Sequence, residues 1–180
     1  MRRINTILVL MILALFADHA IFASLHSIGV GNGVIKAMAH SMLGLVLIHA
    51  AVSLIVTVKA EKAGITTKAR YNKENREFWN RRVTGVLILV LGVTHAYLMN
   101  RNERGIPRIA FAPKIFELTT PLLVITIYLH IMTNIRSLLI SLGIRNIDRN
   151  EKIIKAITSV VMAFAFVAIS YVSLKYMGGH

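Results

Sequence analysis

Apolar residues fall into five long stretches, separated by short segments rich in lysine and arginine. The stretches cover Ile4–Ser24, Gly33–Val58, Phe78–Met99, Lys114–Gly143 and Lys152–Met177. Each is long enough to cross a hydrocarbon core about 30 Å thick at about 1.5 Å per helical residue. We find no internal repeat, low-complexity segment or flexible linker. The pattern predicts an all-α polytopic membrane protein, a five-transmembrane-helix bundle that forms one domain over residues 1–180.

Composition and charge support this class. Hydrophobic residues make up 56% of the chain, and 21 lysines and arginines against 8 acidic residues give a net charge of +13. The basic residues cluster between apolar stretches, which is typical of membrane loops and argues against a nucleic-acid-binding face. Fifteen of them share one predicted side: Arg2, Arg3, eight from Lys59 to Arg82 and five from Arg136 to Lys155. The positive-inside rule then predicts a cytoplasmic N-terminus and an outer C-terminus.

The first stretch also has features of a signal peptide. Arg2 and Arg3 precede an apolar run, and Ala20–Ala23 offers small residues for cleavage. The run is longer than a usual signal-peptide core, and Asp18 and His19 would be unusual within one. We therefore interpret it as the first transmembrane helix.

Histidines stand out inside the apolar stretches. His19, His49, His95 and His130 each lie well within one stretch, and the fifth stretch has none. An imidazole at membrane depth needs a polar partner, because hydrocarbon solvates neither ring nitrogen. The chain has no cysteine, which excludes thiolate-bound iron–sulfur clusters and thioether-linked haem within it. The pattern indicates two non-covalent b-type haems, each held between two histidines.

Residue counts assign the four histidines to two depths. His19 lies 15 residues after Ile4, and His95 lies 13 residues after Arg82, so both sit about 20 Å from the cytoplasmic edge. His49 and His130 are nearer that edge, at roughly 9–15 Å. We therefore predict an outer pair, His19 with His95, and an inner pair, His49 with His130.

His40 and His26 compete with these assignments. His40 is nine residues before His49, which turns it to the opposite helix face, and His26 is seven residues after His19 at the expected helix end. Either could be a polar residue at the membrane interface, a quinone-site residue, or the outer ligand in place of His19.

Small residues accompany the histidines. Gly85 and Gly92 lie on one face of the third stretch, and Gly44 and Ser53 flank His49 in the second. They could leave room for a porphyrin or permit close helix packing, which is common in membranes.

The run Phe78-Trp79-Asn80-Arg81-Arg82-Val83-Thr84-Gly85, followed by His95, resembles a known family. It is similar to the cytochrome b subunit of succinate:quinone and quinol:fumarate oxidoreductases, in the single-subunit di-haem type, and Ile169–Lys175 resembles that family's last helix. The resemblance extends from about Met42 onward. It implies that the four histidines are axial haem ligands. Either Arg81 or Arg82 would then pair with haem propionates, since a guanidinium matches a carboxylate bidentately.

The resemblance also implies partners and a location. We expect a flavoprotein subunit carrying FAD and an iron–sulfur subunit on the inner face, and a lipid-embedded anchor in a bacterial cytoplasmic membrane. The complex could form a dimer. The chain would be an enzyme only as the subunit that reacts with quinone. Its substrate would be a menaquinone-class quinone on the outer side, where the residues able to exchange protons are Asp18, His26, His40 and Glu117.

The chain departs from the family in the short connection Leu25–Gly33 and in a minimal N-terminal extension. Two alternatives follow. The chain could be the cytochrome b of another membrane dehydrogenase, such as a hydrogenase or formate dehydrogenase, or a haem-free anchor or transporter that uses its histidines for protons or packing.

Overall fold

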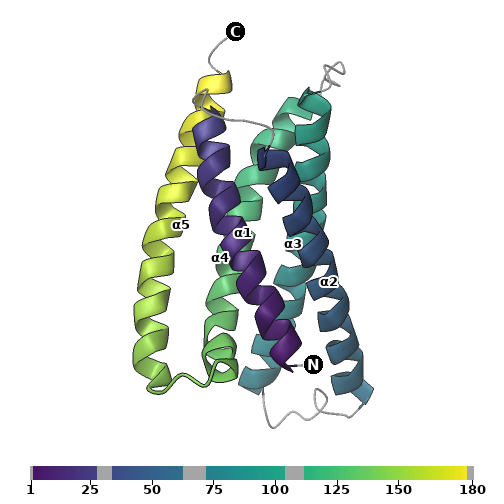
Figure 1. Ribbon diagram of the computed structural model, residues 1–180, viewed down its shortest axis with the longest axis vertical. Coiled ribbons are helices and arrows are strands. Elements are labelled where there is room, and N and C mark those ends of the chain that lie inside the picture. The colour runs from purple at the N-terminus through teal and green to yellow at the C-terminus, as the bar shows by residue number, and fades with distance from the viewer. Residues whose placement is uncertain (1, 28–33, 63–71, 104–111, 178–180) are drawn as a thin grey trace.

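Five α-helices make up the described part of the chain, residues 2–27, 34–62, 72–103 and 112–177 of a computed structural model. They are α1 (Arg2–Ser27), α2 (Val34–Lys62), α3 (Asn72–Glu103), α4 (Ala112–Ser141) and α5 (Ile147–Met177). The helices lie side by side and alternate in direction (Figure 1). Within the described residues, α1 to α4 each contain a stretch long and apolar enough to cross a membrane. The all-helical fold is confirmed, and the length and composition of these four helices are consistent with a membrane protein. The fifth span and the orientation stay predictions.

Two helices begin well before the apolar stretches that predicted them, whereas α4 ends at Ser141, two residues before its predicted end. α3 begins six residues before Phe78, and α5 begins five residues before Lys152. The added segments contain Glu, Lys and Arg, which form helix readily and which a search for apolar spans does not count. Such helices would carry their polar ends beyond the hydrocarbon region.

A tight turn joins α4 to α5. Gly143 has φ +70°, its N–H donates to the Ile140 carbonyl at 3.2 Å, and the Ile144 N–H donates to the Leu139 carbonyl at 3.1 Å. This is the Schellman arrangement, which satisfies the last carbonyls of α4 with a left-handed glycine. The next helix therefore returns directly alongside α4.

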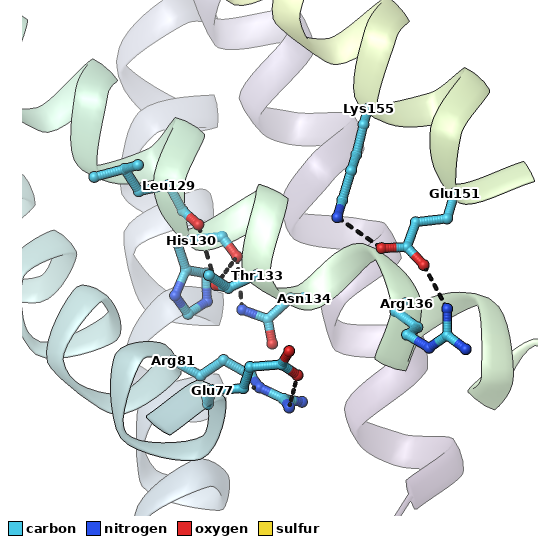
Figure 2. Close-up of polar contacts among 9 residues, drawn as sticks. All are labelled: Glu77, Arg81, Leu129, His130, Thr133, Asn134, Arg136, Glu151 and Lys155. Atoms are coloured by element: carbon cyan, nitrogen blue, oxygen red, sulfur yellow. Dashed lines mark hydrogen bonds and ion pairs between the residues drawn. The ribbon is translucent and has the colours of Figure 1, made fainter. Parts of the chain in front are cut away.

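Ion pairs reinforce this turn. Arg136 on α4 contacts Asp148 on α5 at 2.7 Å. It also contacts Glu151 at 2.8 Å, and Glu151 contacts Lys155 at 2.6 Å, as Figure 2 shows. The Arg136 hydrogen bond lowers the pKa of Asp148, and the Lys155 hydrogen bond, followed by that of Arg136, lowers the pKa of Glu151.

The bundle consists of two halves. α1 packs mainly on α2, while α3 packs on α4 and α4 on α5; contacts between the two groups are fewer. We call the boundary between α1–α2 and α3–α5 the seam. The hydrogen bonds that cross it include Thr6 Oγ1 to Ser141 Oγ at 3.0 Å and Arg82 Nε to Thr57 Oγ1 at 2.9 Å. Both lie toward the end of the bundle where α1 begins and α2 ends (Figure 1).

The apolar core lies on one side of the seam. Among the described residues, the buried apolar side chains are Val124, Ile135 and Leu139 on α4 and Met162 on α5. The helices that carry the other histidines, α1 to α3, contribute none to this set. The protein's own side chains therefore pack the α4–α5 region most tightly and the seam less so.

Candidate functional site

Four helices carry one candidate ligand each: His19 on α1, His49 on α2, His95 on α3 and His130 on α4. All four side chains are partly buried. His95 interacts electrostatically with His19, and His130 interacts electrostatically with His49. The structure thus brings together the members of the outer pair and the members of the inner pair. Each pair takes one imidazole from either side of the seam.

The two pairs lie at different heights. On α3, His95 follows Thr84, which contacts His130, by 11 residues; on α4, His130 follows Thr120, which contacts His95, by ten. Both counts place the pairs about 15–17 Å apart along the bundle. Because α3 and α4 are antiparallel, two similar sites lie one after the other along the seam.

A threonine holds one imidazole of each pair. Thr84 Oγ1 on α3 lies 2.8 Å from His130 Nδ1 on α4. Thr120 Oγ1 on α4 lies 3.1 Å from His95 Nδ1 on α3. The two helices therefore exchange equivalent contacts, and each orients the histidine of the other. Thr120 directly precedes Pro121, which lies inside α4 and leaves one helix carbonyl without its usual donor.

The backbone near His130 is also fixed by polar side chains. The His130 carbonyl accepts hydrogen bonds from Asn134 Nδ2 at 2.7 Å and from Thr133 Oγ1 at 3.0 Å, as Figure 2 shows. Gly85 faces the ring, since a Cβ placed there would lie 3.6 Å from His130 Cε1. That is ordinary van der Waals contact, so Gly85 sits directly against the imidazole.

The two arginines of the inner site have different partners. Arg82 reaches across the seam to Thr57 and lies with its guanidinium carbon 4.0 Å from the centre of the Phe78 ring. It interacts electrostatically with both His49 and His130, and Arg81 also interacts with His130, although less strongly. Arg81 instead donates from Nε to the Glu77 carbonyl at 3.1 Å and lies 3.7 Å from the Glu77 carboxylate (Figure 2). Arg82 is therefore the arginine directed into the seam.

In the described part of the chain, one ring nitrogen of each of two histidines lacks a hydrogen-bond partner. Nδ1 of His19 and Nδ1 of His49 are buried and make no hydrogen bond in the described part of the chain. A buried polar atom without a partner costs free energy, so the polypeptide alone leaves these two rings unsatisfied. Iron bound at Nδ1 would supply that partner, whereas iron bound at Nε2 would leave Nδ1 unpaired.

Open space lies beside two glycines. A Cβ added at Gly44 or at Gly92 would meet nothing within 4 Å. Neither glycine is therefore needed for close helix packing in this arrangement. Gly44 is exposed whereas Gly92 is partly buried, so the space beside Gly92 is the part of this observation that fits a flat macrocycle between the halves. His19 with His95 and His49 with His130 would hold two such groups.

The described residues contain no cluster of three or more His, Asp or Glu side chains suited to a metal ion. A bis-histidine haem has only two protein ligands, so it does not require such a cluster.

The candidate quinone residues are placed only in part. Asp18 on α1 and His40 on α2 are exposed, and both lie toward the same end of the bundle as the outer pair. The side chains of His26 and Glu117 lie outside the described residues, as does most of the connection from Leu25 to Gly33.

Sequence reasoning missed three threonines: Thr57, Thr84 and Thr120. Thr84 lies within the Arg-Val-Thr-Gly run and was the easiest to find. The other two carry no local signal, because their roles depend on which helix stands opposite.

Comparisons with protein-family models, curated proteins and solved structures found no match to this chain.

Proposed function

We propose that this chain is a di-haem membrane cytochrome b that anchors a succinate dehydrogenase or fumarate reductase-type complex and carries its electrons to or from quinone. The single observation that supports this most is the pairing of four membrane histidines across one seam, His95 with His19 and His130 with His49. A haem-free transporter or anchor has no evident need for two such pairs at separate heights.

The pairing favours electron transfer over other haem chemistry. Haem b bound between two imidazoles supplies one-electron redox chemistry and has no open coordination position for oxygen or substrate. The protein residues would orient the two groups, exclude water and keep their edges within one bundle. With the pairs about 15–17 Å apart along the axis, successive sites would span about half of a hydrocarbon core about 30 Å thick.

Arg82 would pair with a haem propionate at the inner site. Its Nε is already bound to Thr57 and its guanidinium is stacked on Phe78, so the side chain is held in place before the carboxylate arrives. Its two terminal nitrogens form the edge that binds a carboxylate bidentately. Arg81 is engaged by Glu77 and is the weaker candidate.

The inner pair would exchange electrons with an iron–sulfur subunit bound at the basic end of the bundle, and a flavoprotein carrying FAD would lie beyond it. The outer pair would serve a menaquinone-class quinone. Quinone reduction takes up protons, so an ionisable side chain must stand within hydrogen-bond reach. Asp18, directly before His19 in the chain, is the described candidate nearest an outer ligand in sequence. This scheme places the N-terminus in the cytoplasm and the protein in a bacterial cytoplasmic membrane.

Purification from detergent-solubilised native membranes tests the proposal. The expected preparation contains this chain, a flavoprotein with FAD, an iron–sulfur subunit and b-type haem that acid acetone extracts. Haem with a hydrogenase or formate dehydrogenase partner would retain the cytochrome and reject the succinate–fumarate assignment. A preparation without haem would reject the cytochrome itself.

A further inference from the structure

The hydroxyl of Thr84 has three polar neighbours and only one proton to donate. Thr84 Oγ1 lies 2.7 Å from the Asn80 carbonyl, 3.3 Å from the Arg81 carbonyl and 2.8 Å from His130 Nδ1. A hydroxyl has one proton to donate and two lone pairs that accept. The carbonyl oxygens can only accept, so the proton must point to them, and the shorter contact is with Asn80.

The direction of the Thr84 proton determines whether His130 Nδ1 donates or accepts. With its proton directed at Asn80, Thr84 Oγ1 can only accept from His130 at 2.8 Å. Nδ1 of His130 must then carry the hydrogen. In a neutral imidazole one nitrogen is protonated and the other carries the lone pair, so the lone pair resides on Nε2.

We propose that Thr84 is a positioning residue that fixes His130 in the Nδ1–H tautomer and so presents Nε2 as the iron-binding nitrogen of the inner site. The inference rests on the proposed haem function and adds to it the residue that selects the ligand atom. A hydrogen bond from the second imidazole nitrogen sets ring orientation and raises ligand basicity. The Thr84 contact therefore favours the oxidised inner haem relative to one whose histidine lacks the bond.

The position of Thr84 suits this role. It precedes Gly85, whose missing side chain leaves His130 Cε1 in van der Waals reach. The bond to Asn80 ties the hydroxyl to the first polar turns of α3, and the rigid contact between α3 and α4 carries that geometry to the ring. An isolated helix-surface threonine has the first bond and lacks the second.

The test is a redox titration of the purified full-length protein carrying Thr84→Val, Thr84→Ser or the control Thr94→Val. Thr94 is also on α3, and its hydroxyl bonds the Val90 carbonyl of its own helix at 2.8 Å. In Thr84→Val the inner haem should become easier to reduce, with a several-fold rise in the reduced-to-oxidised ratio at the original midpoint. A tenfold rise would correspond to about 59 mV for a one-electron couple.

The outer haem should keep its potential in all three proteins, and Thr84→Ser should restore the wild-type inner potential. An unchanged inner potential in Thr84→Val with both haems bound would overturn the role of Thr84 and leave the di-haem function intact. If Thr84→Val loses the inner haem, Thr84→Ser must retain it at the wild-type potential, or the inference fails. An absence of haem from the wild-type protein would overturn the proposed function instead.

Discussion

The contact between Arg82 and Thr57 should stabilise the seam by a measurable amount. Arg82 Nε donates to Thr57 Oγ1 at 2.9 Å, and Thr57 is among the few buried polar residues described. Hydrogen bonds to charged groups contribute about 1.5–3 kcal/mol in soluble proteins, whereas interhelical bonds in membranes average about 0.6 and reach about 1.7 kcal/mol. Because Arg82 is only half-buried, we expect a coupling of about 1 kcal/mol, within the range for membrane proteins and below the range for charged groups in soluble proteins.

The single variants differ in what else they remove. Arg82→Gln also loses the contact with Phe78 at 4.0 Å, which adds about 0.5–2 kcal/mol. Thr57→Val keeps the shape of the side chain and loses the acceptor together with its own bond to the Ser53 carbonyl. We therefore expect Arg82→Gln to destabilise the protein more than Thr57→Val, and the double variant to be less destabilised than the sum.

The assay is a double-mutant cycle on the free energy of unfolding in mixed detergent micelles, with Thr94→Val as a threonine that serves only its own helix. The cycle should be repeated with haem bound, where Arg82→Gln should cost more if Arg82 also pairs with a propionate. A coupling below about 0.3 kcal/mol, the usual error of additivity, would refute the argument that this contact joins the two halves.

Two further predictions concern other parts of the bundle. Gly92→Leu should reduce outer haem content and leave the stability of the haem-free protein unchanged or higher, because the added side chain enters open space and leucine forms helix better than glycine. Absorbance of extracted haem and unfolding of the haem-free protein measure the two effects. A destabilised haem-free protein with normal haem content would contradict the prediction. Arg136→Ala should destabilise the α4–α5 turn at pH 7. This difference should begin to shrink as the pH falls through the ordinary carboxyl range near about 4 and disappear only below the lowered pKa values of Asp148 and Glu151, where protonation removes the stabilisation. Unfolding of both proteins from pH 7 down to about 2 tests it, and a pH-independent difference would count against the ion pairs.

The sequence predicted the apolar helices and the relative depths of the histidines along them. Long apolar stretches are enough to predict that α1 to α4 can cross a membrane, because that depends on length and hydropathy alone. Residue counts from the charged ends placed His19 level with His95, and the structure brings the same two imidazoles into electrostatic interaction. Their role as axial ligands stays a prediction.

Lateral contacts were beyond the sequence argument. Nothing local to Thr120 indicates that it faces His95 from the neighbouring helix, because that depends on the rotation of α4 about its axis. The sequence could not distinguish Arg81 from Arg82 for the same reason, because adjacent residues on a helix point about 100° apart and the rotation of α3 decides which one faces the seam. The polar start of α5 at Ile147 was missed because a membrane-span criterion does not detect helix outside the hydrocarbon region.

The most direct test of the central claim is the haem content of paired histidine variants. The wild-type chain should bind two b-type haems. Loss of either outer ligand or of both, in His19→Ala, His95→Ala and the double variant, should leave only the inner haem. A variant lacking both His19 and His49 should retain no haem. Extracted haem per chain and redox titration in membranes decide this. If His19→Ala kept both haems at normal potentials while His40→Ala lost the outer one, the outer ligand would be His40; a wild-type ratio near zero would contradict the account as a whole.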